Sequence, residues 1–175
     1  RAAVRPKSAY KYHVTLSNDE VVNAYAAPGG YIVVNAGLLA KTKRPEQLAG
    51  ILAHEIQHVE QRHATKGICR EFTMSAILRA VTGGSAFGAV GSAAKTLGAL
   101  SYSRDAEEEA DRQGMRLMRD AAVDPRGMVE AFEMLEDEGG DVQGALAYLS
   151  THPRTADRVA SLKRLAAQPM KPVVP

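Results

Sequence analysis

Apolar and polar residues alternate in short runs through the first 35 positions of the chain. Residues 12–16 read Tyr-His-Val-Thr-Leu and are followed by a Ser-Asn-Asp turn. A period of two residues is typical of a strand with one buried face. Two more apolar runs, Val21–Tyr25 and Tyr31–Val34, flank a Pro-Gly-Gly sequence that breaks the chain. The pattern predicts a small antiparallel sheet over residues 10–34, whose last strand is a candidate edge.

After residue 35 the apolar spacing changes to three and four residues, which is the period of an amphipathic helix. The clearest case follows Pro45, where positions 48, 51, 52, 56 and 59 are apolar. We expect a helix over residues 45–66, with proline in its first turn and Gly67 as its end. Further helices are predicted over residues 68–81 and 101–122 and within 125–167. The glycine-rich residues 83–100 between them form a candidate lid. The expected fold class is therefore α+β, mainly helical with a small sheet near the N-terminus.

Composition narrows the classes of protein without choosing among them. A chain of 175 residues suits a single domain over residues 1–175, and 45% hydrophobic and 24% charged residues are ordinary for a soluble protein. The net charge of +2 gives no indication of nucleic-acid binding. No uninterrupted apolar run reaches the roughly 18 residues that a membrane span requires. The single cysteine, Cys69, excludes an internal disulfide and is expected to be buried. The chain opens at Arg1 rather than methionine, which is compatible with a targeting segment or membrane anchor upstream.

One pentad inside the helix predicted over residues 45–66 carries candidate chemistry. It reads His54-Glu55-Ile56-Gln57-His58, an H-E-x-x-H pattern. Histidines four residues apart share one face of a helix, so both imidazoles reach the same cation. Glu55 lies beside the first histidine and is suited to hold a water that such a cation polarises.

A catalytic zinc ion usually has three protein ligands, so this pair needs a distant third. His63 is excluded, because five residues along a helix turn it about 140° away from His58. Glu107 and Asp111 are four residues apart, so that one carboxylate is placed to bind a metal and the other to accept a histidine N–H. A solvated charged face is an equally good explanation of that acidic run. The remaining candidates are Cys69, His13, His152, Asp105, Glu108 and Glu109.

Four motifs in one order resemble a known family. They are Asn23–Gly30, the pentad His54–His58, Ser103–Asp111 with its pattern S-R-x-x-E-x-x-A-D, and His152–Arg158 with its pattern H-P-x-x-x-x-R. This arrangement is similar to the gluzincin zinc metallopeptidases that include HtpX, the CAAX prenyl endopeptidases and the periplasmic BepA-like peptidases. The similarity runs from about Tyr12 to Leu165 and implies a zincin-like domain. The lack of multiple membrane spans points to the soluble branch.

The resemblance implies roles for individual residues. Glu107 corresponds to the third zinc ligand, beside His54 and His58, for one Zn²⁺ per chain. Asp111 corresponds to the aspartate that orients a histidine ligand, and the resemblance indicates that this ligand is His54. His152 and Arg158 correspond to a loop and helix near the metal, where His152 either stabilises the oxyanion or approaches the zinc when substrate is absent. Without the resemblance, His152 is simply a residue at a helix N-terminus. Ser103 and Arg104 are expected to be structural.

The resulting hypothesis is a zinc-dependent endopeptidase that cuts extended or unfolded proteins, with Glu55 as general base. The strand Tyr31, Ile32, Val33 and Val34 is predicted to bind an extended peptide as an additional strand. The expected partners are unfolded protein substrates, including outer-membrane or envelope proteins, in a periplasmic or otherwise extracytoplasmic compartment. Nucleic acid is not an expected partner.

Two other hypotheses stay open. The chain is alternatively a metal-bearing scaffold that binds clients without cleavage, its site closed by the lid or by His152. In the third hypothesis the pentad is an accident on a structural helical domain and binds no metal.

Overall fold

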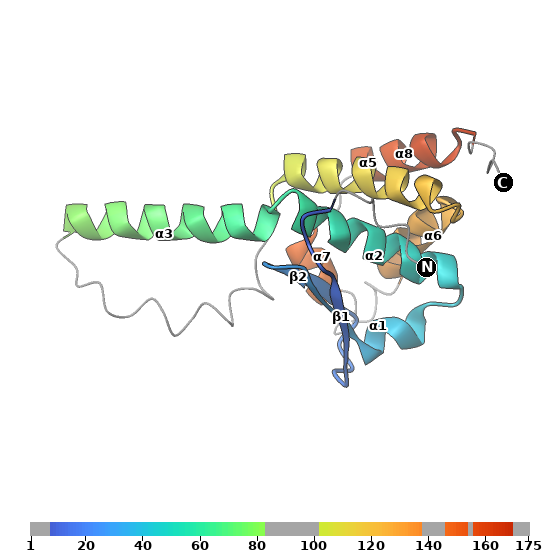
Figure 1. Cartoon of the computed structure of the whole chain (residues 1–175), viewed down its shortest axis with the longest axis horizontal. Helices are drawn as coiled ribbons and strands as arrows, with labels where there is room; N and C mark the ends of the chain where they lie inside the picture. The colour runs from blue at the N-terminus through green and yellow to red at the C-terminus, as the bar shows by residue number, and fades with distance from the viewer. Residues whose placement is uncertain (1–7, 83–101, 138–145, 154–155, 170–175) are drawn as a thin grey trace.

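A computed structural model of the chain describes residues 8–82, 102–137, 146–153 and 156–169 (Figure 1). Within them a three-stranded sheet near the N-terminus is followed by helices, so the α+β class is confirmed. The candidate lid over residues 83–100 lies outside the described residues.

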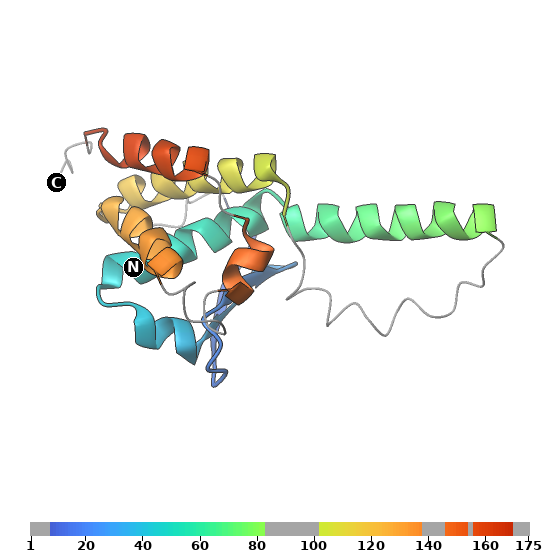
Figure 2. The ribbon, with the colours of Figure 1, turned by 180° about the vertical axis from the view of Figure 1, so that it is seen from behind.

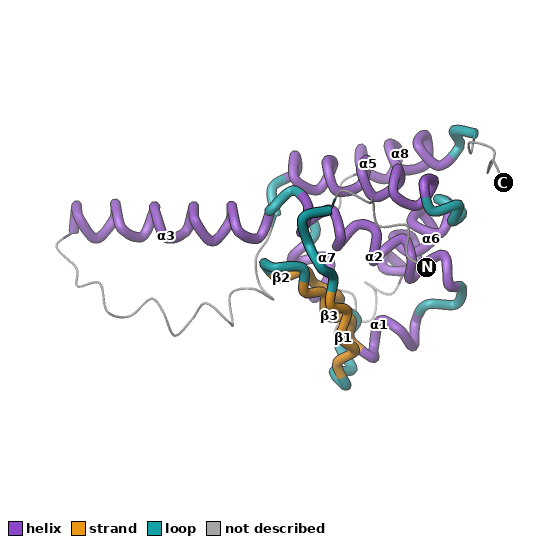
Figure 3. The backbone as a smooth tube through the Cα atoms, in the orientation of Figure 1, coloured by secondary structure: helices purple, strands orange, loops and turns teal. Residues whose placement is uncertain are grey.

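The sheet consists of β1 (His13–Ser17), β2 (Ala24–Ala27) and β3 (Tyr31–Asn35) in the spatial order β1-β3-β2 (Figure 3). β2 and β3 form an antiparallel hairpin, but β1 pairs parallel to β3. The predicted all-antiparallel sheet is therefore wrong in one of its two pairings. The chain reverses twice between β1 and β3, and β1 pairs with β3 rather than with β2. Alternation within each strand carries no information about that order.

β3 is consequently the central strand, which corrects the prediction that Tyr31, Ile32, Val33 and Val34 bind a peptide at an edge. Both of its backbone edges are already paired, one with β1 and the other with β2. Within the described residues, the unpaired edges belong to β1 and β2.

The turn between β2 and β3 depends on two glycines. Gly29 and Gly30 have φ angles of +93° and +96°, a region that residues with a Cβ rarely adopt. A Cβ on Gly30 would lie 2.5 Å from the carbonyl oxygen of Lys11. The glycine pair thus allows both the reversal and the close approach of the segment that leads into β1.

β1 differs from the predicted strand with one buried face. Its side chains Val14 and Leu16 are 56% and 55% exposed. β1 lies at the outer edge of the sheet, whereas the helix α2 packs mainly against β2 and β3. The alternating pattern therefore predicted the strand correctly, but the burial of its apolar side chains incorrectly.

Seven helices are described, and their bounds are α1 (Ala36–Lys41), α2 (Pro45–Glu60), α3 (His63–Thr82), α5 (Arg104–Asp120), α6 (Arg126–Asp137), α7 (Leu146–Thr151) and α8 (Ala156–Ala166). α2 lies among α5, α6 and the sheet. Its buried Ile51 and Val59 join a core that includes Met115, Met128 and Phe132. Among the described helices, the pentad therefore stands on the one that packs against the sheet and against both α5 and α6.

The helix predicted over residues 45–66 ends early, and the prediction of Gly67 as its end is wrong. α2 stops at Glu60, and Arg62 adopts a positive φ of 57° before α3 begins at His63. A residue in the left-handed region commonly ends a helix, although that residue is usually glycine. Because arginine gives no such signal, the break was not predicted, and Gly67 lies inside α3.

α3 extends away from the other elements, as both ribbon views show (Figures 1 and 2). Cys69 on this helix is exposed, which corrects the expectation that it is buried. Among the described helices, none combines the length and apolarity that crossing a membrane would require.

Candidate metal centre

The two histidines of the pentad point the same way from α2. His54 Nε2 and His58 Nε2 are 3.0 Å apart, and both side chains are buried. The start of α2 is set locally by Gln47, whose Oε1 accepts the backbone N–H of Arg44. The helical period then places the two imidazoles one turn apart on the buried face, as the sequence predicts.

α5 brings a carboxylate to the same point. Ser103 begins this helix, because its Oγ accepts the backbone N–H of Ala106 at 3.3 Å. Small residues let α5 approach α2 closely: a Cβ on Gly114 would lie 3.3 Å from the carbonyl carbon of Ala53. Glu107 is therefore fully buried against α2, with Oε1 3.3 Å from His58 Nε2 and Oε2 3.5 Å from His54 Nε2.

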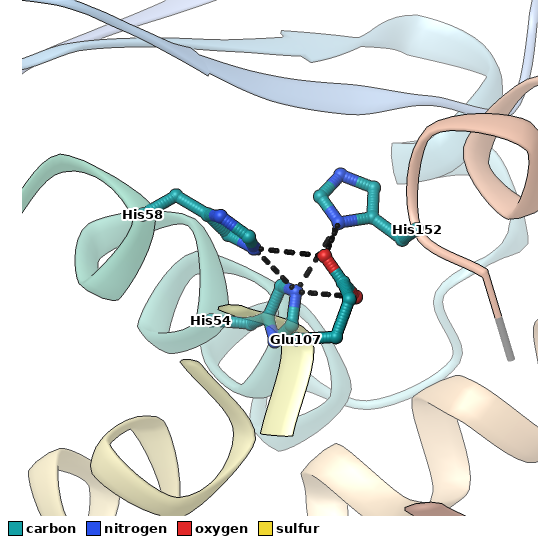
Figure 4. A group of neighbouring side chains, drawn as sticks. All are labelled: His54, His58, Glu107 and His152. Carbon is teal, nitrogen blue, oxygen red and sulfur yellow. Dashed lines mark hydrogen bonds and ion pairs between the residues drawn. The ribbon is translucent and has the colours of Figure 1, made fainter. Parts of the chain in front are cut away.

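His152, which directly follows the last residue of α7, completes the group. Its Nδ1 lies 3.1 Å from Glu107 Oε1 and 3.3 Å from His54 Nε2. Figure 4 shows the four side chains converging from α2, α5 and the end of α7. One ligand atom from each lies within 4.8 Å of all the others, and all four residues are buried.

This group fits a tetrahedral cation. Ligand atoms at about 2.0–2.1 Å from a zinc ion in a tetrahedron stand about 3.3 Å from one another. Five contacts within the group, which use both oxygens of Glu107, span 3.0 to 3.5 Å, and one ligand atom from each residue lies within 4.8 Å of the others. Three histidines and a carboxylate, all buried, are also a donor set that zinc prefers.

The charges around His54 favour a positive charge at this position. Burial lowers the pKa of His54, but hydrogen bonds to Asp111 and Glu107 outweigh it and raise the pKa to about 10. The pKa of Glu107 lies well below its usual value: burial raises it, but the neighbouring His152, His54 and His58 lower it more. A cation bound among these groups would supply the positive charge that the carboxylate otherwise draws from a proton.

Asp111 and Arg158 contact the candidate ligands His54 and Glu107 on the side away from the centre of the group. Asp111 Oδ1 is 3.0 Å from His54 Nδ1, the nitrogen that faces away from the cluster. Arg158, on α8, donates Nε to Asp111 Oδ2 at 2.7 Å and Nη2 to Asp111 Oδ1 at 2.8 Å. Its Nη1 is also 2.7 Å from Glu107 Oε2. The guanidinium thus joins the two carboxylates, and it is only 1% exposed.

Glu55 is buried next to the cluster without being part of it. Its Oε1 lies 3.5 Å from His152 Nε2 and accepts a hydrogen bond of 3.3 Å from the Tyr148 hydroxyl. Burial raises the pKa of Glu55, although the nearby histidines oppose this. A carboxylate with a raised pKa is suited both to accept a proton and to return it.

Sequence reasoning missed Tyr148. This fully buried tyrosine on α7 stacks on His152 with ring centroids 4.4 Å apart, and its hydroxyl reaches Glu55. The only sequence signal was its position, four residues before His152 on the same helical face. The other candidates lie elsewhere: His13 stacks on Tyr31 in the sheet, and Asp105 and Glu108 are exposed.

Comparison with known proteins agrees with the motifs. Residues 1–166 match the family model described as Peptidase family M48. The chain is 31% identical to the putative beta-barrel assembly-enhancing protease of Vibrio cholerae over 86% of its length, and this covers 34% of that protein. The corresponding Escherichia coli protease is 31% identical over 93% of the chain and 36% of its own length. The mitochondrial metalloendopeptidase OMA1 of Schizosaccharomyces pombe is 32% identical over 92% of the chain and 48% of its own length. The chain therefore spans about a third of the bacterial relatives and about half of the yeast one.

Proposed function

The chain belongs to peptidase family M48 and carries a metallopeptidase domain, and we propose that it is a zinc-dependent endopeptidase acting on extended or unfolded proteins. The observation that supports this most is the buried convergence of His54, His58, Glu107 and His152. In this proposal His54, His58 and Glu107 hold the ion, because they stand on the two helices packed against each other at the centre of the molecule.

The proposed chemistry divides between the ion and Glu55. Zinc, when bound, acts as a Lewis acid toward the attacking water and the scissile carbonyl. Glu55 accepts the proton of that water through its buried carboxylate and returns it to the leaving amine. Tyr148 holds Glu55 Oε1, while Glu55 Oε2 is buried without a hydrogen-bond partner among the described residues. We propose that this unpaired oxygen, Glu55 Oε2, accepts the proton of the water.

His152 controls access to the site in this proposal. With it, the group offers four ligands, whereas a catalytic zinc site keeps one position open for water. His152 must therefore move away before the water enters. If its main role is to block the site, His152→Ala should raise zinc-dependent cleavage of short peptides. A loss of that activity would instead indicate that His152 donates a hydrogen bond to the oxyanion.

We assign substrate binding to the free edge of β2 rather than to β3. Ala26 and Ala27 line a small pocket together with His58, so this strand ends beside the metal centre. Asn35 N–H donates to the Asn23 carbonyl across the hairpin, so by alternation the backbone N–H and C=O groups of Ala24 and Ala26 point away from β3. Both residues are buried, so this edge must open before a peptide can pair with it. A peptide added here gains main-chain hydrogen bonds with little dependence on sequence. Peptides carrying a single N-methyl group should lose cleavage at alternate positions; uniform cleavage would exclude this mode.

The finer biological role follows the relatives and is part of the proposal. Two of them are named as proteases that enhance beta-barrel assembly, and another as a mitochondrial metalloendopeptidase. We propose unfolded outer-membrane or envelope proteins as clients, in the periplasm or another extracytoplasmic compartment, and protein quality control as the role.

Substitution of the assigned base tests the activity. Zinc-loaded protein should cleave unfolded casein, and Glu55→Gln should reduce the rate by about 10²- to 10⁴-fold while zinc content stays unchanged. Glu46→Gln in the first turn of α2 is the matched control and should retain the rate. If Glu55→Gln keeps the full rate of cleavage, Glu55 is not the base. If the wild-type protein binds no zinc, the whole proposal is wrong.

The scaffold hypothesis keeps one supporting observation, the closed four-residue group. It predicts that wild-type protein binds unfolded casein without cutting it, even when His152→Ala opens the site. Casein binding that survives in Glu55→Gln alongside cleavage by the wild type would instead indicate a peptidase with a separate client-binding surface.

A further inference from the structure

The second nitrogen of His58 has a partner that the metal centre does not account for. In Figure 4 this nitrogen points away from the other three side chains. His63 Nδ1 lies 3.0 Å from it, with the ring centroids 4.9 Å apart and the planes at 71°. Both histidines are buried, with His58 1% and His63 7% exposed.

The break between α2 and α3 creates this contact. In one continuous helix, His63 would stand about 140° around the axis from His58. The positive φ of Arg62 ends α2, and His63 becomes the first residue of α3. The helix is therefore interrupted at this point, and the His63 ring packs beside the ring of His58.

Hydrogen-bond roles in the pair follow from the direction in which His58 faces. His58 Nε2 points toward Glu107 and His54, so it must carry a lone pair in order to bind a cation. The proton of a neutral His58 then sits on Nδ1 and is donated to His63 Nδ1. A histidine ligand usually gives this proton to a carboxylate, a backbone carbonyl or water, and a histidine acceptor is less common.

The environment of His63 favours one tautomer. If Nδ1 accepts, the proton of His63 sits on Nε2, which lies 3.6 Å from Glu109 Oε2. Glu109 is on α5, two residues after Glu107, so the same helix that supplies a ligand also faces this histidine. Tyr102 covers the pair, with its ring centroid 4.0 Å from that of His58. His58, His63 and Glu109 thus form a line in which every proton has one consistent position.

We propose that His63 is a positioning residue of the metal centre, which accepts the Nδ1 proton of His58 and so holds Nε2 turned toward the cation. This inference rests on the proposed zinc site. It gives His58 a support equivalent to the one that Asp111 gives His54. Glu109 acts one step further out, where its partly exposed carboxylate favours the proton of His63 on Nε2.

Zinc affinity of purified full-length variants, measured by competition with a chromophoric chelator, tests this role. His63→Ala should weaken zinc binding by roughly 10- to 100-fold. His63→Gln should restore most of the affinity, because its amide oxygen can accept the same proton. His13→Ala removes an exposed histidine of the sheet and should leave the affinity unchanged.

Two further readouts separate positioning from mere packing. Imidazole nitrogen spectra of the zinc-loaded wild type should place the His58 proton on Nδ1, bonded to a ring nitrogen. If His63→Ala lowers only the melting temperature of the zinc-free protein and keeps its zinc affinity, His63 is structural and the inference is wrong. Equal weakening in His63→Ala and His63→Gln also contradicts it. Wild-type protein that binds no zinc would instead refute the proposed site itself.

Discussion

Three carboxylates and one guanidinium are buried within a few ångströms of one another, and each carboxylate has a different environment. Glu107 faces three histidines, Asp111 pairs with Arg158 and His54, and Glu55 faces Tyr148 and His152. The first two have lowered pKa values and stay ionised, whereas burial raises the pKa of Glu55. Separated pKa values in one pocket are typical of groups with different chemical roles. The proposed ligand, orienting residue and base are all carboxylates, so their contacts rather than their residue type distinguish them.

The two neighbouring glutamates of α5 provide a direct test of the ligand assignment. Glu107→Ala should release zinc far more readily than Glu108→Ala, because Glu107 is fully buried at the cluster whereas Glu108 is exposed. Metal content after dialysis against a weak chelator measures the difference. Equal retention in the two variants would remove Glu107 from the ligand set.

Close helix packing places these residues, and small side chains make it possible. Gly50 on α2 and Gly114 on α5 both face Met128 of α6. A Cβ on Gly50 would lie 2.5 Å from Met128 Cα, whereas a Cβ on Gly114 would lie 2.8 Å from the mobile end of the Met128 side chain, Cε. Interiors packed this closely tolerate added atoms only where a neighbour can move. The α2–α6 contact is therefore the less adaptable of the two.

Alanine at these two glycines should have unequal effects on stability. Gly50→Ala should destabilise the fold by roughly 1–3 kcal/mol, because the backbone of α6 must shift. Gly114→Ala should cost less, since Met128 can take another rotamer. Urea unfolding of both variants measures the two free energies. A larger loss for Gly114→Ala would mean that its 3.3 Å contact with Ala53, not Met128, limits the packing there.

The prediction of elements from the sequence succeeded where the signal was local. A period of 3.6 residues placed His54 and His58 on one face of a helix, and the strand runs were found near their observed positions. The helix end at Glu60 was missed, because the turn is made by Arg62 in a left-handed conformation that arginine does not announce. The parallel pairing of β1 was missed, because strand order depends on which edges meet in space.

At the scale of the whole molecule, the candidate metal centre connects elements that are far apart in the chain. Its four candidate ligands come from α2, from α5 and from the end of α7, which lie far apart in the chain. A cation bound there would link these elements only in the folded state, since the unfolded chain does not bring the ligands together. Zinc binding and global stability should therefore be coupled.

Removal of zinc should lower the melting temperature as well as the activity. Stability gained from a ligand grows as RT ln(1 + [L]/Kd), about 2.7 kcal/mol at a free concentration 100 times the dissociation constant. Scanning calorimetry with buffered zinc measures the rise in melting temperature. The Glu107→Ala variant serves as control and should show a much smaller rise. A melting temperature that does not respond to zinc in the wild type would show that the site is not coupled to folding.

The sequence by itself determined what neighbours along the chain can do: it paired His54 with His58 and set Glu55 beside them, because a helix has a fixed period. Through resemblance to a known family it also indicated Glu107, Asp111 and Arg158. Only the tertiary structure decided which strand edges lack a partner, that His152 stands among the candidate ligands, and that His63, rejected as a ligand, contacts the far side of His58. These outcomes depend on how separate elements pack against one another and on the positive φ angle of Arg62 that ends α2. The periodicity of apolar residues within one element predicts neither the packing nor that angle.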